Sequence, residues 1–159
     1  MNADRVDGKN STDLVPGGSV PAGATMRGNY EIDGYASAAG VLVGGDSISF
    51  GYKLPSEPTG VFVPAGAGST GQCPGTYTSP QARPGYLCVY EGAYINKQTG
   101  SPIVYPVTTV GAGIYLNSGN AGSSYSSGTW AVTVPSAAQA AKLPSKKDSG
   151  AAGTRRPRP

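Results

Sequence analysis

Hydrophobic and polar residues alternate most regularly over residues 47–54. The large apolar side chains of this segment all fall on one side of an extended chain: Ile48, Phe50, Tyr52 and Leu54. The residues between them are Ser, Gly and Lys. A period of two predicts a strand with one buried face and one wet face, as in antiparallel sheets. We therefore expect a strand over 47–54 whose four large side chains enter the core.

Six more segments have a similar strand character, being short and rich in Tyr, Val, Ile and Thr: 29–36, 59–63, 86–90, 103–109, 113–117 and 129–134. The segments between them are rich in residues that favour turns: 44–45, 55–58, 64–84, 97–102 and 118–128. Short strands separated in this way are typical of two-sheet folds. The pattern predicts an all-β fold, either an antiparallel β-sandwich or a jelly roll, with extended arms at both termini. Helical propensity is limited to 136–143, where Pro144 ends the segment.

The composition divides the chain of 159 residues into three regions. Every aromatic residue lies within 26–135, which we expect to be the β domain. Residues 1–25 are polar and rich in Gly and Pro, so they are predicted to form an N-terminal arm and linker. Residues 136–159 are predicted to form a basic tail that contains Pro and Arg. A chain of this length has room for one domain and such arms.

Positive charge is concentrated in the C-terminal tail. This tail has six basic residues and one acidic residue, so it accounts for the formal net charge of +3. Its last residues include Arg155, Arg156 and Arg158 on a backbone stiffened by proline. A basic arm of this kind can bind an acidic groove of a partner subunit, and the alternative is a solvated terminus without a partner. Nucleic acid is an unfavoured partner because no aromatic residues are interleaved for base stacking.

The residue types needed for catalysis are scarce. The chain has no His to activate a Ser or Thr nucleophile, and two Cys without His do not complete a tetrahedral metal site. The acidic residues of the β region could pair in space, although most of them lie beside turns, where solvation explains them: Glu31, Asp33, Asp46, Glu57 and Glu91. We expect no enzyme activity, no cofactor and no metal site.

Cys73 and Cys88 lie 15 residues apart and flank a loop rich in Pro and Gly. A disulfide between them would remove loop-closure entropy worth about 3 kcal/mol, and it would fasten the longest irregular segment to the strand 86–90. We favour this pairing over two free thiols. A disulfide would also indicate an oxidising final compartment.

The ten Tyr residues are the most informative surplus in the composition. Tyr52, Tyr90 and Tyr115, together with Trp130, lie in predicted strands and are expected in the core. The tyrosines expected in or beside loops are candidates for glycan binding, with packed loops as the alternative: Tyr77, Tyr94 and Tyr125. A tyrosine suits such a site because it has a large flat face and a polar tip.

Residues 2–14 resemble the NAD-x-LDGK-x-ST-x-F units of actinobacterial surface proteins and phage tail-fibre-like proteins. Val6 and Leu14 stand where Leu and Phe are usual in that unit. Residues 20–135 are also similar to the β domain that follows such units. The segments that carry the similarity are 20–25, 46–50, 84–92 and 128–134. The resemblance implies a non-enzymatic extracellular or virion component.

These features together predict a virion structural protein, either a capsid decoration protein or a fibre component. Its arms would dock on other subunits through Val6, Leu14 and the arginines of the tail, and we expect a homo-oligomer. The alternative is a bacterial cell-surface module that binds glycan through loop tyrosines. The chain shows no signal peptide and no membrane span in its sequence, so the expected location is a virion surface or the extracellular space.

Overall fold

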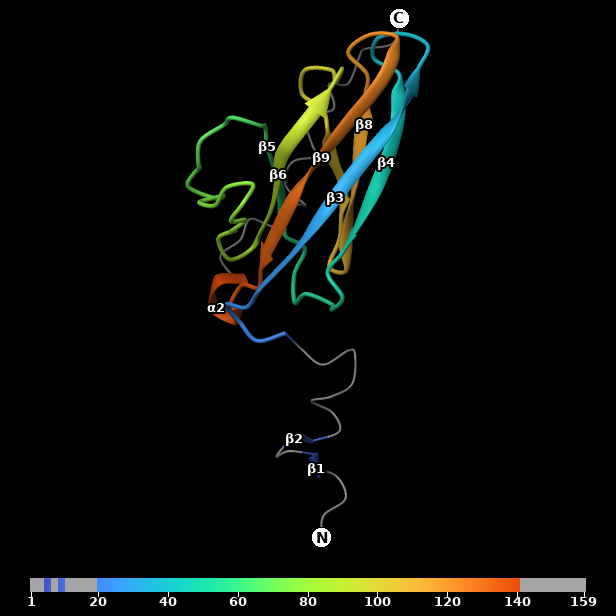
Figure 1. Ribbon diagram of the computed structural model, residues 1–159. Coiled ribbons are helices and arrows are strands. Elements are labelled where there is room, and N and C mark those ends of the chain that lie inside the picture. The colour runs from blue at the N-terminus through green and yellow to red at the C-terminus, as the bar shows by residue number, and fades with distance from the viewer. Residues whose placement is uncertain (1–4, 7–8, 11–19, 141–159) are drawn as a thin grey trace, which may run out of the picture.

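The computed structural model describes residues 5–6, 9–10 and 20–140, and β-strands dominate these ranges (Figure 1). The four-stranded sheet has the order β3-β9-β6-β5 and the three-stranded sheet has the order β4-β8-β7. Their strands are β3 (Thr25–Ala36), β4 (Leu42–Ser49), β5 (Thr59–Val63), β6 (Tyr86–Ile95), β7 (Ile103–Val107), β8 (Gly111–Asn117) and β9 (Gly122–Thr133). The prediction of an all-β fold is confirmed.

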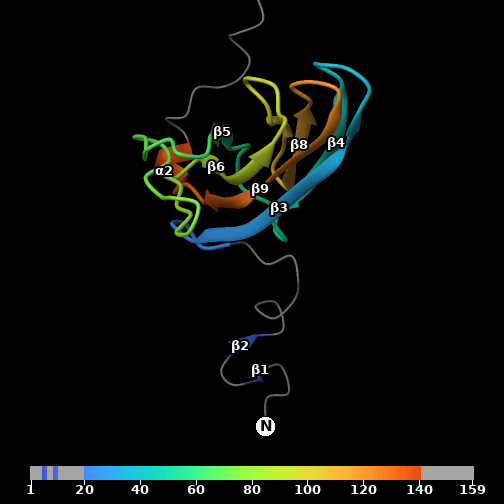
Figure 2. The ribbon, with the colours of Figure 1, turned by 45° about the horizontal axis from the view of Figure 1, so that its top comes forward.

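The longest strand pairing joins β3 and β9. The two strands run antiparallel from the pair Thr25–Thr133 to the pair Ala36–Gly122. On its other side β9 pairs antiparallel with β6, while β5 and β6 are parallel. A parallel pair requires the chain to return along the length of the strand. Residues 64–85 make this return without a regular helix, and Figure 2 shows them as a broad excursion beside β5 and β6.

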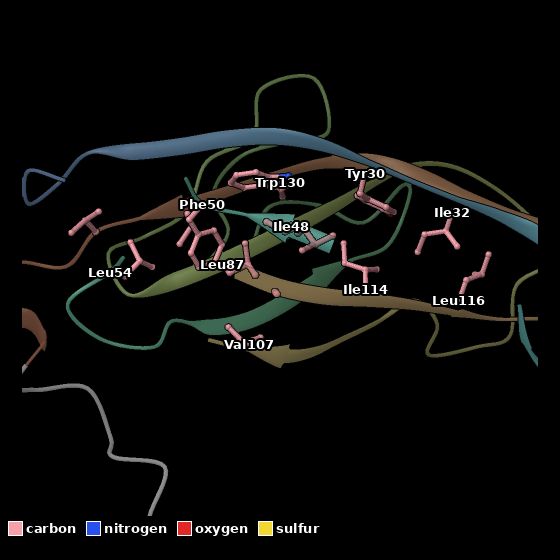
Figure 3. Close-up of a cluster of buried hydrophobic side chains, with 14 residues drawn as sticks. Tyr30, Ile32, Ile48, Phe50, Leu54, Leu87, Val107, Ile114, Leu116 and Trp130 are labelled. Carbon is pink, nitrogen blue, oxygen red and sulfur yellow. The ribbon is translucent and has the colours of Figure 1, made fainter. Parts of the chain in front are cut away.

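The main core lies between the two sheets (Figure 3). The four-stranded sheet contributes Tyr30, Ile32, Leu87, Val89, Trp130 and Val132, and the three-stranded sheet contributes Ile48, Val107, Ala112, Ile114 and Leu116. The Phe50 and Trp130 rings pack at a centroid distance of 6.1 Å. Full burial of one such side chain stabilises the fold by about 1.5–3 kcal/mol. The predicted core position of Trp130 is confirmed, because only 6% of it is exposed.

The predicted strand over 47–54 is wrong in its second half. Strand β4 ends at Ser49, and Gly51 has a φ of +71°, which turns the chain. The side chains of Phe50 and Leu54 still reach the core, but Tyr52 does not, since it is 43% exposed. Tyr115 is also more exposed than predicted, because it alternates with the buried residues on either side of it in β8.

A second correction concerns residues 118–128, which were expected to separate strands. Most of this segment belongs to β9, the strand that pairs with both β3 and β6. Its small residues allow close approach: a Cβ added at Gly128 would lie 2.0 Å from the carbonyl oxygen of Tyr90. Tertiary packing therefore overrides the turn propensity of Ser and Gly here.

Little regular structure is described outside the two large sheets. β1 (Arg5–Val6) pairs antiparallel with β2 (Lys9–Asn10). The short helix α2 (Ala137–Ala140) lies within the segment of predicted helical propensity. At its start the Ser136 hydroxyl accepts a hydrogen bond from the Gln139 amide at 3.2 Å. The predicted docking residues Leu14, Arg155, Arg156 and Arg158 lie outside the described residues.

Candidate functional site

The outer face of the four-stranded sheet carries a row of residues in register across three strands. Ile95 on β6 lies opposite Tyr125 on β9, and Tyr125 lies opposite Asp33 on β3. Tyr35 lies two residues further along β3, on the same face as Asp33. Cβ atoms of directly opposite residues are about 4.5–5.5 Å apart. The register therefore gathers two tyrosines, an isoleucine and a carboxylate at one end of this face.

Tyr77 joins this face from the loop that connects β5 and β6. Its carbonyl oxygen accepts a hydrogen bond from the Thr129 hydroxyl at 2.8 Å. Its ring lies against Gly92, where an added Cβ would come within 2.4 Å of the ring. Gly92 falls at an irregularity in the β6–β9 ladder, between Glu91 and Ala93. A glycine at this point leaves the space that the Tyr77 ring occupies.

We call the residues Tyr35, Tyr77, Ile95 and Tyr125 the tyrosine strip. Three of them are strongly exposed: Tyr35 by 76%, Ile95 by 61% and Tyr77 by 46%. Tyr125 is half-buried between its neighbours. The exposed carboxylates of Glu31 and Asp33 flank the strip on β3. The site is thus an open aromatic surface with hydrogen-bond acceptors along one side.

The loop that carries Tyr77 is fixed by a second, smaller core on the outer face of the sheet. This core consists of Val63, Cys73, Cys88 and Tyr90. The Cys73 and Cys88 sulfur atoms are 2.04 Å apart, so the predicted disulfide is confirmed. The Tyr90 hydroxyl accepts a hydrogen bond from the Gly75 amide at 3.0 Å and donates one to the carbonyl oxygen of Gln81. Burial raises the pKa of Tyr90 above its ordinary value.

A pocket of about 200 Å³ lies beside Tyr77, where the loop meets β5 and β6. It is lined by Val63, Pro64, Gly66, Ala67, Thr76, Tyr77, Tyr90 and Glu91. This volume is below the range of about 300–1,000 Å³ that is typical of pockets for small molecules. A pocket of this size is too small to hold a whole ligand by itself. It can extend the exposed strip, because Tyr77 belongs to both.

Glu91 is a buried carboxylate, and its role is structural. Its Oε2 atom lies 3.1 Å from Lys97 Nζ and accepts a hydrogen bond from the Ala65 amide at 3.1 Å. Its Oε1 atom accepts a hydrogen bond from the Ser126 hydroxyl at 3.1 Å. Both oxygens therefore have polar partners, as buried polar groups generally require.

Lys97 is the cationic partner of Glu91 in this buried ion pair. Its ammonium group lies 4.7 Å from the centroid of the Tyr94 ring and 5.4 Å from that of Phe62, and it donates a hydrogen bond to the Ser101 carbonyl oxygen. The sequence analysis explained most acidic residues by solvation beside turns, and for Glu91 this is wrong. Residues 97–102 were expected to be a turn segment, so the sequence did not predict an ion pair between Lys97 and Glu91.

The structure separates the three tyrosines that were predicted to bind glycan. Tyr77 and Tyr125 share the outer face, whereas Tyr94 pairs with the buried Ser126 and points to the opposite face of the sheet. The irregularity at Gly92 explains the difference, because an extra residue in a strand exchanges the faces of all the residues that follow it. Tyr94 and Tyr125 also lie in strands and not in loops.

Tyr35 is the member of the strip that sequence reasoning missed. In the predicted strand 29–36 the sequence pattern grouped it with Tyr30 and Ile32 near one face. The strict alternation of β3, in which Tyr30 and Ile32 are buried, puts Tyr35 on the outer face. The odd spacing from Ile32 to Tyr35 was the signal that could have identified it.

The described ranges contain no group of His, Cys, Asp or Glu residues that could hold a metal ion. Within the same ranges, no helix is long and apolar enough to cross a membrane. A search for relatives among protein families, curated proteins and solved structures gives no significant match for this chain.

Proposed function

We propose that this protein is a non-enzymatic binding module that holds a neutral glycan along its tyrosine strip. The observation that carries the proposal is the gathering of Tyr35, Tyr77 and Tyr125 on one exposed face beside the carboxylates of Glu31 and Asp33. Three aromatic side chains held by strands and by a disulfide-bonded loop form a rigid surface. Rigid aromatic side chains bind at a low cost in conformational entropy.

The chemistry of the strip matches that of a sugar chain. The C–H groups of a sugar ring can lie on the negatively polarised face of an aromatic ring, while tyrosine hydroxyls hydrogen-bond to the sugar hydroxyls. The carboxylates of Glu31 and Asp33 accept hydrogen bonds from hydroxyl groups, and such charge-assisted bonds are stronger than neutral ones. The same negative charges disfavour phosphate-rich or sulfated polymers, so the favoured ligand is uncharged.

An extracellular location agrees with the disulfide between Cys73 and Cys88, since disulfides persist in oxidising compartments. The absence of enzyme activity is part of the proposal. Glu31 and Asp33 lie on an open face, and catalytic carboxylates generally need a site that excludes water. An exposed strip suits retention of a polymer better than its cleavage.

We also propose that the fold is a β-sandwich and that the protein is displayed on a virion. Two sheets with a shared core support the first assignment. The parallel β5–β6 pair and the three-stranded sheet argue against a jelly roll, which has eight strands. The virion assignment rests on the resemblance of residues 2–14 and on the terminal arms. Deletion of residues 1–20 or 144–159 should abolish association with a particle and leave the domain folded.

The glycan proposal is tested by sedimentation of the purified protein with isolated actinobacterial cell walls, and by affinity electrophoresis in gels that contain dextran, galactan or arabinogalactan. Tyr35→Ala and Tyr125→Ala should each weaken retention at least tenfold, because each removes a stacking surface. Tyr52→Ala is the matched control, since Tyr52 is exposed but lies in the turn after β4. Retention that is unchanged in both strip variants would overturn the proposal, as would an absence of retention by every polymer.

A further inference from the structure

The outer face of the three-stranded sheet is a second exposed surface, and it is apolar. Ile103 on β7 lies opposite Tyr115 on β8, and Tyr115 lies opposite Gly45 on β4. Tyr105 follows Ile103 by two residues along β7, and Leu42 lies at the far end of β4. The exposed fractions are 58% for Leu42, 46% for Ile103, 66% for Tyr105 and 38% for Tyr115. We call these four residues the apolar face.

Glycines make the apolar face flat. A Cβ added at Gly45 would lie 2.9 Å from the Tyr115 ring, and one added at Gly113 would lie 3.0 Å from the same ring. The ring of Tyr115 therefore lies across both glycines. This part of the face, around Tyr115, is flat and can approach another surface closely, as the centres of protein interfaces require.

The apolar face is also free of charge. β4, β7 and β8 together contain one charged residue, Asp46. Its carboxylate accepts hydrogen bonds from the Glu31 amide at 3.2 Å and from the Ser47 amide at 2.7 Å, so it is directed toward the junction with β3. By contrast, the outer face of β3 alone presents Arg27, Glu31 and Asp33. Exposed apolar patches of this kind mark interaction sites.

We propose that the apolar face binds the same face of a second copy of this chain. In a two-fold dimer the same surface patch of both copies comes into contact. A patch with net charge therefore repels its copy, whereas an uncharged patch does not. The apolar face is uncharged and can pair with its copy. The outer face of the four-stranded sheet, which we call the strip face, carries two neighbouring carboxylates and would repel its copy. A dimer built in this way leaves the tyrosine strips on opposite outer sides, where each strip can bind a separate polymer chain.

The size of the apolar face sets the expected affinity. Three strands about 4.8 Å apart and about 20 Å long offer a few hundred Å² on each copy. A stable interface commonly buries about 800 Å² per partner. The dimer is therefore expected to be weak and reversible.

The experiment is sedimentation velocity on the full chain over a series of protein concentrations. The wild type should shift from monomer to dimer as the concentration rises. Tyr105→Lys should weaken association at least tenfold, because it places a positive charge on both sides of the contact. Tyr35→Lys makes the same change on the strip face, so it should associate as the wild type does. Near-ultraviolet circular dichroism checks that each variant is folded.

A mixing experiment separates a broken interface from a misfolded variant. Tyr105→Lys and Tyr105→Glu should each be monomeric alone, and an equimolar mixture should recover part of the association through opposite charges. A wild type that stays monomeric throughout the series would overturn the proposal, as would a Tyr105→Lys variant that associates like the wild type. A protein that stays monomeric but still binds cell walls through the strip would contradict the dimer proposal and would not affect the glycan proposal.

Discussion

The outer faces of the two sheets differ in charge, in shape and in whether a loop covers them. The strip face carries Glu31 and Asp33, and a disulfide-bonded loop lies over part of it. The apolar face is uncharged and flat, because Tyr115 lies across Gly45 and Gly113. Both faces are built by the same alternation of residues along strands. The lesson is that a two-sheet domain can present two chemically distinct surfaces, and we propose that one binds glycan and the other a second copy of the chain.

The largest expected effect comes from breaking the buried ion pair between Glu91 and Lys97. Lys97→Met leaves Glu91 buried without its counter-ion, so the free energy of unfolding should fall by about 3–5 kcal/mol. Guanidinium chloride unfolding measures this change. The double variant Glu91→Gln/Lys97→Met should recover a large part of the loss, because a buried pair replaced by neutral groups costs little. A single variant as stable as the wild type would contradict the structural role of the pair.

Removal of the disulfide should affect the two faces unequally. Cys73→Ser/Cys88→Ser should lower the free energy of unfolding by about 3 kcal/mol, as expected for a loop of this length. The loop that holds Tyr77 should then loosen, so retention on cell walls should weaken several-fold while the sedimentation of the dimer stays unchanged. Equal losses in both assays would show that the loop supports the whole domain and not the strip face alone.

The smallest expected effect distinguishes buried from exposed tyrosine. Burial raises the pKa of Tyr30 above its ordinary value of 10.0, and a hydrogen bond with Ser126 partly offsets this. In the unfolded chain the Tyr30 hydroxyl releases its proton near pH 10. The contribution of Tyr30 to the free energy of unfolding is therefore fully present below that pH and declines above it. At pH 11 the loss should be about 1 kcal/mol for this group. Urea unfolding at pH 8 and pH 11 measures it.

One variant sharpens the pH test. Tyr30→Phe removes the ionisable hydroxyl and should reduce the pH dependence between pH 8 and pH 11. A pH dependence that is the same in Tyr30→Phe as in the wild type would exclude Tyr30 as its source.

The strand pattern was predictable where a segment alternates cleanly and pairs without irregularity. β5 has the predicted bounds, and the strands predicted at 103–109 and 113–117 correspond to β7 and β8. The pairing of Cys73 with Cys88 was also accessible, because two cysteines flank one loop and no other cysteine competes. Each of these features depends on residues close together in the chain.

The candidate site was predictable only in part. Tyr77 and Tyr125 were identified by their residue type, but Tyr94 was grouped with them because the irregularity at Gly92 could not be read from the sequence. Tyr35 and the buried Glu91–Lys97 pair were missed. Lys97 lies two residues after the end of β6, at an isolated antiparallel bridge to Ser118, and only the folded chain shows that its Nζ atom lies 3.1 Å from Glu91 Oε2.

The sequence by itself determined the all-β class, the closure of the longest loop and the residue types available for binding. Periodicity, turn propensity and cysteine spacing are local properties, so they survive without knowledge of the fold. Only the tertiary structure decided which tyrosines share a face, which strand takes the centre of the four-stranded sheet and which sheet face remains uncharged. These outcomes depend on strand register and sheet order, where a shift of one residue moves every following side chain to the other face.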